Sequence, residues 1–527
     1  MSIAAAKPHS HTTAWRIWLL RAIAAALALA MLMYGVAAID TGIVNFKGSG
    51  NADIAAKRLD IVRAAEAGET NENTRTLSEH SGIAVAFLSE FASAKYSYGK
   101  DGLGETVTAY ATAPKTNGIA LSLHNALAGT CMLFGALQFW PALRRRFPLW
   151  HRAFGGIYML AAQAAMIGAM YYLVHTPVVA IYDHLTFYVG LWALAIGVTL
   201  TLWLAIYSML RKQIAQHQAF MCLNYGMLLT APIQRYGWLA FGAMGPQDMR
   251  QLEANYAVTA ALVPLSVMIG YALFTINRWT QTDRSASAKQ KTAQPFALHA
   301  KLGRGLAMLS PLALLAAGVT VVQHFVIQPG LSNLDQASQM IPAGVLDMTN
   351  KVVAEHPSSR LLFALATLVG LLGAARLLWQ AFVSQRAPAH YMGASTWALA
   401  VSGMTVGAVL LNWGLAMGMP TFATLEGGAG YLFGGAIAML FSSLLAMALI
   451  QREHTWVKEW GVFVTATLIA VPSFFWQFNL IATLPISAQF IQEGHVFRMA
   501  SAGQWMLLIG AFVYAMFSEA THSKLAR

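Results

Sequence analysis

Long apolar runs alternate with short polar segments along most of the chain. Most runs hold about twenty residues, the length that an α-helix needs to cross the hydrocarbon core of a bilayer. The pattern therefore predicts an all-α protein, a polytopic transmembrane helical bundle of about twelve helices. We expect these helices at residues 17–37, 118–140, 153–174, 185–210, 219–241, 256–276, 302–326, 361–383, 393–417, 431–450, 462–481 and 499–517.

The composition fits a chain that lies mostly in lipid. Hydrophobic residues make up 57% of it and charged residues 11%, whereas a soluble protein carries about a quarter charged residues. We therefore expect the lipid bilayer as its surroundings. The formal net charge of +12 suits basic cytoplasmic loops better than a nucleic acid partner. The two cysteines, Cys131 and Cys222, are too few for a disulfide framework.

The positions of Lys and Arg predict an orientation. If the N-terminus is cytoplasmic and the helices alternate, about 21 of the 34 basic residues lie in cytoplasmic segments. The short outer loops hold only Arg235, Arg250, Lys351, Arg360 and Arg498. The others fall in a long first outer segment, which escapes the rule. This bias predicts a multi-pass protein of the bacterial inner (cytoplasmic) membrane with both termini in the cytoplasm.

Changes in hydrophobicity divide the chain into five parts. Residues 1–38 form an N-terminal membrane anchor, which we expect to stay uncleaved because its apolar run is long for a signal peptide; cleavage is the alternative. Residues 39–116 are polar and are expected to be an extracytoplasmic segment that binds a membrane or periplasmic protein. Two four-helix units are expected at 117–245 and 246–420, followed by a three-helix segment at 421–527.

The second four-helix unit has features of a repeat of the first. Histidines stand at corresponding helix ends in both units, which suggests a duplication in parallel orientation. The four pairs are His151 with His299, His175 with His324, His184 with His356, and His217 with His390. The alternative is that histidine is common at membrane interfaces, where its polar ring costs little to place.

Several polar side chains are expected near the outer face of the membrane. Ionisable residues inside membrane helices are costly and are therefore functional candidates. The candidates for a substrate or proton path, or for a cofactor site, are His124, Asn125, His175, Asp183, His184 and Arg235. The alternative is that they are hydrogen-bonded interface residues with no ligand.

A second polar group is expected at the inner face and comprises Gln138, His151, Arg152 and His217. Neutral imidazoles from two helices can bind a haem iron axially. Haem b is therefore a candidate cofactor, with His124, His151 and His217 as candidate ligands; placement near lipid phosphates is the alternative. His151 and His175 lie about 36 Å apart along one helix, so both fall at the edges of a layer about 30 Å thick. This placement argues against a simple two-haem arrangement.

The stretch from His124 to Tyr158 resembles domain of unknown function 2306, a family of uncharacterised prokaryotic membrane proteins. It contains a His, then Gly-Ala-Leu-Gln-Phe, a basic run and Trp-His-Arg with a nearby Gly and Tyr. Ala136 replaces the usual Pro of the family pattern. Residues 217–221 resemble its His-Arg-x-x-Met segment, with Gln in place of Arg, and the resemblance covers about residues 118–245. A weaker likeness to two-haem transmembrane b-type cytochromes implies haem.

Three classes of function fit these patterns. The first is a haem-b or quinone-linked membrane redox protein. The second is a transporter or channel for a small solute or proton. The third is an accessory subunit that scaffolds a membrane complex. The sequence contains no Walker motif, HExxH or GxSxG, so nucleotide, metallohydrolase and serine-hydrolase chemistry has no positive support. Whether the chain is an enzyme stays open.

Overall fold

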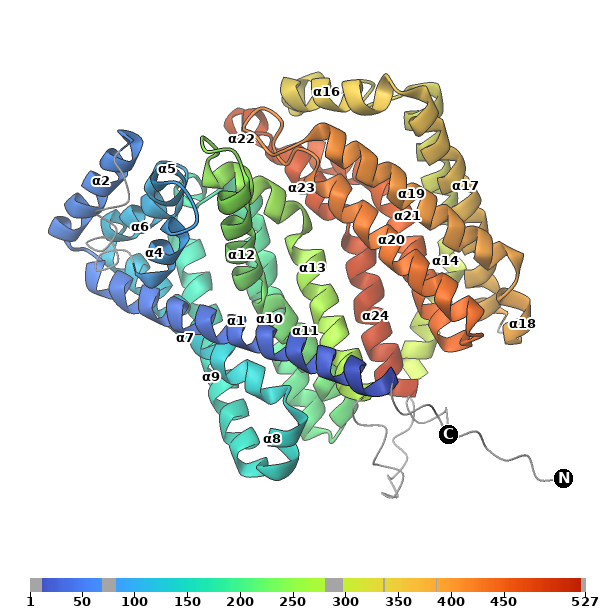
Figure 1. The fold of residues 1–527 in the computed structure, drawn as a ribbon, viewed down its shortest axis with the longest axis horizontal. Coiled ribbons are helices and arrows are strands. Elements are labelled where there is room, and N and C mark those ends of the chain that lie inside the picture. The colour runs from blue at the N-terminus through green and yellow to red at the C-terminus, as the bar shows by residue number, and fades with distance from the viewer. Residues whose placement is uncertain (1–11, 69–81, 280–296, 335–336, 385, 523–527) are drawn as a thin grey trace. The chain divides into compact units, whose positions relative to one another are not determined.

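The computed structural model describes residues 12–68, 82–279, 297–334, 337–384 and 386–522, and these residues are almost entirely helical. Eleven of the helices in this part of the chain are long and apolar enough to cross a membrane (Figure 1). The predicted polytopic helical bundle is therefore confirmed.

Two expected spans are each formed by two helices, and the first of them is the span expected at 219–241. The helices α11 (Ile214–Leu228) and α12 (Thr230–Met244) meet at Leu229. Pro232 has no backbone N–H to donate to the carbonyl four residues earlier, which explains a break at this point. Ten of the other expected spans each overlap one long helix, and the last, 499–517, covers the end of α23 (His495–Gly503) and most of α24 (Met506–His522).

The described residues divide into two compact units. Unit 1 holds α1 (Thr12–Gly48), α7 (Lys115–Gln138), α8 (Pro141–Arg146) and most of α9 (Pro148–His175). The α1 helix is longer than the predicted first span. Small residues let α1 and α7 approach closely, because a Cβ at Gly129 would lie 2.6 Å from the Gly35 carbonyl oxygen.

Unit 2 holds the rest of the long helices. Those before residue 330 are α10 (His184–Leu210), α11, α12, α13 (Gln251–Trp279) and α14 (Ala297–Val322), which continues as the π-helical segment η3 (Gln323–Ile327). Those after it are α17 (Pro357–Leu378), α19 (Ala394–Met417), α20 (Ala429–Ile450), α21 (His454–Ala482), α23 (His495–Gly503) and α24 (Met506–His522). Short helices join them: η2 (Val178–Ala180), α15 (Ala337–Met340), α16 (Ala343–Thr349), η4 (Asn350–Ala354), η5 (Trp379–Val383), α18 (Pro388–Tyr391) and α22 (Ala488–Gln492).

The polar segment expected at 39–116 also forms helices, namely α2 (Ala52–Glu66), α4 (Ile83–Ser89), α5 (Ala94–Tyr98) and α6 (Leu103–Thr112). Residues 59–71 and 88–106 belong to unit 2 and the others to unit 1. In unit 2, the Tyr96 hydroxyl donates a 2.7 Å hydrogen bond to the Trp238 carbonyl oxygen. Arg250 pairs with Glu66 and lowers the pKa of that carboxyl to about 2. The five-part division of the chain stays a prediction.

Large apolar side chains cover the outside of the long helices. Leu160 in unit 1 is 76% exposed, and Leu312 and Leu372 in unit 2 are 68% and 74% exposed. A soluble protein rarely exposes contiguous apolar surface of this kind. These surfaces therefore face lipid, and the expected bilayer surroundings are confirmed.

The core of unit 2 contains a layer of aromatic rings. Tyr271 of α13, Phe441 of α20, Phe463 of α21 and Phe512 of α24 are buried, and their ring centroids lie 4.8–5.6 Å apart in five of the six pairs. Among these helices, α13 and α21 each pack against both α20 and α24. The layer fills the space between α13, α20, α21 and α24 with close-packed rings.

Glycines allow the backbones of α19 and α20 in unit 2 to approach each other closely. A Cβ at Gly435 of α20 would lie 2.8 Å from the Gly407 carbonyl oxygen of α19, and a Cβ at Gly407 would lie 2.9 Å from the Gly435 carbonyl oxygen. Gly414 and Gly428 face each other in the same way one heptad away. Without a hydrophobic force between helices in lipid, such close backbone contact is a main source of helix association.

We expect Gly435→Ala to destabilise the protein by about 1–3 kcal/mol, because the new methyl group would meet backbone atoms that cannot move without separating the helices. The measurement is the thermal unfolding of the detergent-purified protein. Gly510→Ala in α24 is the matched control, because no atom lies within 4 Å of its Cβ position. That change should be neutral or stabilising by up to about 1 kcal/mol. Equal effects of the two substitutions would contradict the glycine interface.

Candidate functional site

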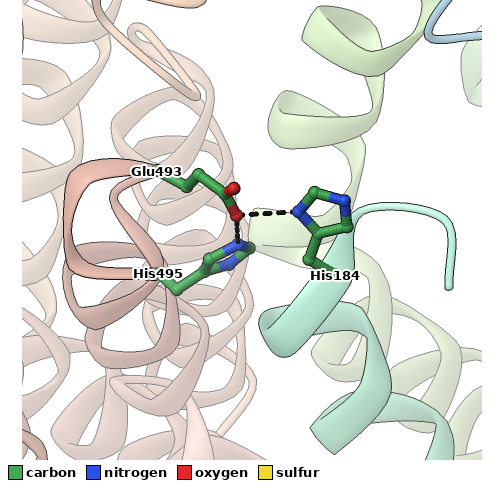
Figure 2. Close-up of side chains that lie close together, drawn as sticks. All are labelled: His184, Glu493 and His495. Atoms are coloured by element: carbon green, nitrogen blue, oxygen red, sulfur yellow. Dashed lines mark hydrogen bonds and ion pairs between the residues drawn. The ribbon is translucent and has the colours of Figure 1, made fainter. Parts of the chain in front are cut away.

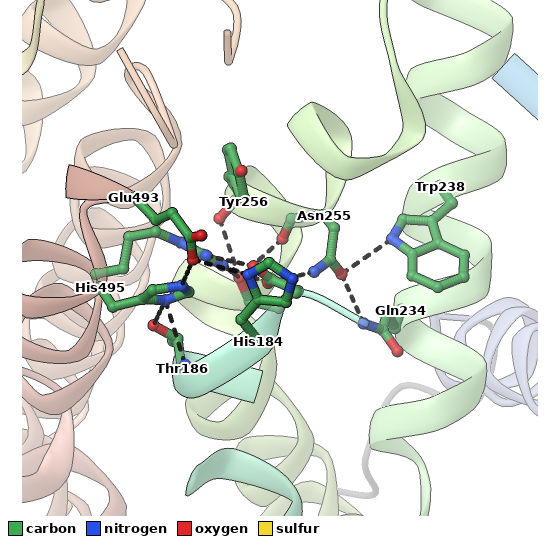
Figure 3. Close-up of polar contacts among 11 residues, drawn as sticks. His184, Thr186, Gln234, Trp238, Asn255, Tyr256, Glu493 and His495 are labelled. Carbon is green, nitrogen blue, oxygen red and sulfur yellow. Dashed lines mark hydrogen bonds and ion pairs between the residues drawn. The ribbon is translucent and has the colours of Figure 1, made fainter. Parts of the chain in front are cut away.

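A buried polar network lies at the end of unit 2 where α10, α13 and α23 begin (Figure 3). Asp183 ends the short segment before α10 in a left-handed backbone conformation, with φ of 58°. Aspartate tolerates this conformation better than most residues. Gly494, with φ of 78°, makes the turn from which α23 starts. These two turns bring residues of distant sequence position to one place.

The centre of this network is a buried ion pair between Asp183 and Arg498. Both side chains are almost fully buried, at 2% and 3% exposure. Arg498 donates from both terminal nitrogens, and the Nη2 to Oδ2 distance is 2.5 Å. The guanidinium also stacks over the Tyr256 ring at 4.2 Å and donates to the Thr259 hydroxyl at 3.3 Å. Such a bidentate pair fixes both orientation and distance.

Asn255 extends the network from the ion pair to α12. Its Nδ2 donates to Asp183 Oδ2 at 2.6 Å. Its Oδ1 accepts hydrogen bonds from Gln234 Nε2 at 2.6 Å and from Trp238 Nε1 at 3.2 Å. Arg235 donates to the Gln234 side-chain oxygen and lies 4.5 Å above the Trp238 ring. Buried polar groups are therefore connected from α10 through α13 to α12.

A second carboxyl group lies close to Arg498. Glu426 is buried in the segment between α19 and α20 and accepts a 2.6 Å hydrogen bond from the Ser501 hydroxyl. Ser501 follows Arg498 by three residues on α23, so both lie on one face of that helix. Burial raises the pKa of Glu426 to about 7, while the Ser501 hydrogen bond and the charge of Arg498 act in the opposite direction.

Two histidines and a glutamate form a further cluster beside this network (Figure 2). Glu493 Oε2 lies 2.7 Å from His184 Nδ1 and 3.0 Å from His495 Nε2. Gln489 Nε2 donates to the other oxygen of Glu493 at 3.0 Å. Burial raises the pKa of Glu493, but the hydrogen bonds from His184, Gln489 and His495 outweigh it and the pKa is lowered. Glu493 is thus a carboxylate at neutral pH.

The structure brings together three of the six residues predicted for the outer polar cluster. Asp183 and Arg235 are joined through Asn255 and Gln234, and His184 follows Asp183 directly. His175 ends α9, eight residues before Asp183. His124 and Asn125 lie in α7 of unit 1, where His124 Nδ1 is 2.8 Å from the Ala165 carbonyl oxygen. Their role as a substrate or proton path stays a prediction.

The residues predicted for the inner group divide between the units. Gln138, His151 and Arg152 belong to unit 1, and His217 belongs to unit 2. A Cβ at Gly155 would lie 3.2 Å from Gln138 Oε1, so this side chain packs on the first turns of α9. His217 Nδ1 lies 3.0 Å from the Ala205 carbonyl oxygen.

The distance between two of the predicted haem ligands excludes one arrangement. His124 contacts the carbonyl of Ala165, which follows His151 by fourteen residues in α9, or about 21 Å along the helix. Two axial ligands of one iron lie within about 4 Å of each other. His124 and His151 therefore cannot bind the same haem. Pairings that involve His217 stay predictions.

Several residues of the network were not among the sequence candidates. They are Gln234, Asn255, Glu426, Glu493, His495 and Arg498. Arg498 was assigned to an outer loop, although its position at the start of an apolar run was a signal that it is buried. Glu493-Gly494-His495 carried a second signal, because a glycine between two polar side chains permits a tight turn.

Comparison with known proteins agrees with a membrane protein of unassigned activity. The sequence profile of the family described as "Predicted membrane protein (DUF2306)" matches residues 121–273. This confirms the resemblance found in the sequence and extends it into α13. The chain is a multi-pass integral membrane protein. No curated protein and no solved structure matches it, and nothing found supports the likeness to b-type cytochromes.

The match contains only part of the site. Asp183, His184, Gln234 and Asn255 lie within the matched residues, whereas Glu426, Glu493 and Arg498 lie far beyond them. The C-terminal segment of this chain therefore supplies the ionic partner of Asp183 and the carboxylate beside His184.

We expect Asp183→Asn and Arg498→Met each to destabilise the protein by about 3–5 kcal/mol, because either change leaves the partner charge buried and unpaired. Asparagine keeps the left-handed conformation of residue 183 accessible. The double variant should lose about 3 kcal/mol less than the sum of the two single losses. Thermal or denaturant unfolding in detergent measures these effects. Strictly additive losses would show that the two side chains do not depend on each other.

Proposed function

We propose that the protein is a proton-coupled membrane transporter for a small solute, and that Glu426 is its proton-binding group. The observation that carries this proposal is the placement of two carboxyl groups, Asp183 and Glu426, around one buried guanidinium, Arg498. Ionisable groups buried in a membrane protein commonly mark the path of a substrate, ion or proton. The bias of basic residues supports an inner-membrane orientation in which this end faces outward.

The charge balance of these three groups supports proton binding. When Glu426 is protonated, Asp183 and Arg498 neutralise each other and the buried group carries no net charge. Loss of the Glu426 proton leaves one excess negative charge in a region of low dielectric constant. Arg498 is then attracted by two carboxylates instead of one. Competition between Asp183 and Glu426 for Arg498 would couple proton release to rearrangement of α10 against α23.

The arrangement of polar and apolar layers in unit 2 also suits a transporter. Asn255 and Tyr271 lie on α13, sixteen residues apart, or about 24 Å along the helix. Tyr271 donates a hydrogen bond to Glu459, far along α13 from the polar network around Asn255. The aromatic layer of Phe441, Phe463 and Phe512 adjoins Tyr271. A path between the two polar ends must therefore open by movement of helices.

Prolines within two of these helices support such movement. Pro264 lies in α13 between Asn255 and Tyr271, and Pro472 lies in α21. Each proline lacks the N–H that would otherwise hold the helix backbone at that point. Bending is therefore easier at these two positions than elsewhere along the helices.

We expect the protein in liposomes to carry protons across the membrane when a pH gradient is imposed in the presence of a mixture of small solutes, and Glu426→Gln to abolish this flux because glutamine cannot release a proton. A pH-sensitive dye inside the liposomes measures the flux. Glu453→Gln is the matched control, because this carboxyl group is exposed at the start of α21. Absence of flux through the wild type, or equal flux through Glu426→Gln, would overturn the proposal.

A stability measurement checks the titration of Glu426 without a substrate. Its pKa in the folded protein, about 7, lies above the ordinary value of 4.5. Protonated Glu426 therefore favours folding at low pH, and this contribution is lost as pH rises from about 4.5 through about 7. The melting temperature of the wild type should fall over this range relative to that of Glu426→Gln.

The redox hypothesis remains as a second candidate because of one observation at His217. Its Nδ1 is hydrogen-bonded to the Ala205 carbonyl oxygen, and histidines that bind metals usually make such a bond with their other nitrogen. If haem b is bound, the protein purified from haem-replete cells should show a Soret band that His217→Ala removes. A colourless preparation would exclude this function. The scaffolding role and the partner of residues 39–116 stay predictions.

A further inference from the structure

The cluster of His184, Glu493 and His495 has the composition of a transition-metal site. It brings two imidazoles and a carboxylate together from elements that are 309 residues apart in sequence. One nitrogen or oxygen from each residue lies within 4.8 Å of the others. Two histidines, one carboxylate and an open fourth position form a common protein site for Zn²⁺.

The distances between the three ligand atoms suit a metal after a small adjustment. Ligand atoms around a tetrahedral Zn²⁺ lie about 3.3 Å apart, since each is about 2.0–2.1 Å from the ion. Glu493 Oε2 is 2.7 Å from His184 Nδ1 and 3.0 Å from His495 Nε2. Movement of Glu493 Oε2 away from the two nitrogens by less than about 1 Å would give the tetrahedral spacing to each of them, and the two nitrogens lie within 4.8 Å of each other.

Neighbouring groups hold the three ligands in this orientation. The Thr186 backbone N–H donates a 3.3 Å hydrogen bond to His495 Nδ1, and the Thr186 hydroxyl lies 2.7 Å from the same nitrogen, so Nε2 is the ring nitrogen that points toward Glu493 (Figure 3). Gln489 Nε2 donates a hydrogen bond to the second oxygen of Glu493. Hydrogen bonds such as that from Gln489 accompany most metal-binding carboxylates in proteins.

The site is also open on one side. The side chains of His184 and Glu493 are 35% and 31% exposed, whereas that of His495 is 3% exposed. An ion can therefore enter from the surface and keep a water molecule or other ligand in its fourth position. Figure 2 shows the three side chains pointing toward one another from α10 and from the turn before α23.

We propose that His184, Glu493 and His495 bind one Zn²⁺ ion or a similar divalent transition metal. The ion would replace the hydrogen bonds of Glu493 to His184 and His495 by bonds to the metal. It would thereby link the start of α10 to the segment that joins α22 to α23. Nitrogen and carboxylate ligands favour this class of metals over Ca²⁺ and Mg²⁺, which prefer oxygen alone. This site is separate from Glu426 and goes beyond the proposed transport function.

The test uses the full chain purified in detergent and stripped of metal with a chelator. Titration with ZnCl₂ in a calorimeter should give one tight site per chain and should raise the melting temperature. Co²⁺ serves as an optical probe, because it gives intense visible bands in a tetrahedral site and weak ones in water. Weak binding at many sites, or a Co²⁺ spectrum like that of the aqueous ion, would overturn the proposal.

Variants separate this site from binding at other histidines. Glu493→Gln and His184→Asn should each weaken Zn²⁺ binding by more than about 100-fold, the upper limit of what the loss of a supporting hydrogen bond usually costs. His356→Asn is the matched control, because this exposed histidine at the start of α17 lies outside the cluster. Unchanged affinity in Glu493→Gln would contradict the site.

Two further measurements keep the result interpretable. The melting temperatures of the metal-free variants show whether they fold, and the Co²⁺ spectrum of the wild type tests the site without any substitution. Glu426→Gln should bind Zn²⁺ as the wild type does, so failure of the transport proposal and failure of the metal proposal are distinguishable. Loss of the site in Glu426→Gln would contradict its independence.

Discussion

The buried ion pair between Asp183 and Arg498 is the interaction on which the organisation of unit 2 depends. It joins the turn before α10 to the first turn of α23, and Asn255 connects it to α13. In surroundings of low dielectric constant neither charge can lose its partner without a large cost. The pair therefore fixes the contact between the matched central segment and the C-terminal helices.

Two groups with different chemistry gather around this pair. Glu426 is buried, accepts a hydrogen bond from Ser501 on the helix that carries Arg498, and has a pKa raised by burial. His184, Glu493 and His495 lie toward the surface and share one carboxylate oxygen between two imidazoles. We infer that proton binding and metal binding occupy adjacent but separate positions. Both depend on the same two turns, because Asp183 precedes His184 and Gly494 separates Glu493 from His495.

The rest of unit 2 provides a closed, tightly packed frame for these groups. Glycine contacts hold α19 against α20, and the rings of Phe441, Phe463 and Phe512 fill the space between α20, α21 and α24. The proposed transport function requires that this frame open, and the prolines of α13 and α21 lie where bending is easiest.

The sequence alone determined the class of the protein, the approximate position of nearly every spanning helix and the resemblance of its central segment. This was possible because a helix in lipid must satisfy its own backbone and present an apolar surface, so its length and composition are local properties. It also identified Asp183, His184 and Arg235 as polar candidates. It missed the break at Leu229, where one proline outweighs an apolar run. The tertiary structure alone decided which polar residues meet. Asp183 and Arg498 are 315 residues apart, and no local pattern encodes a contact that forms only when distant helices pack.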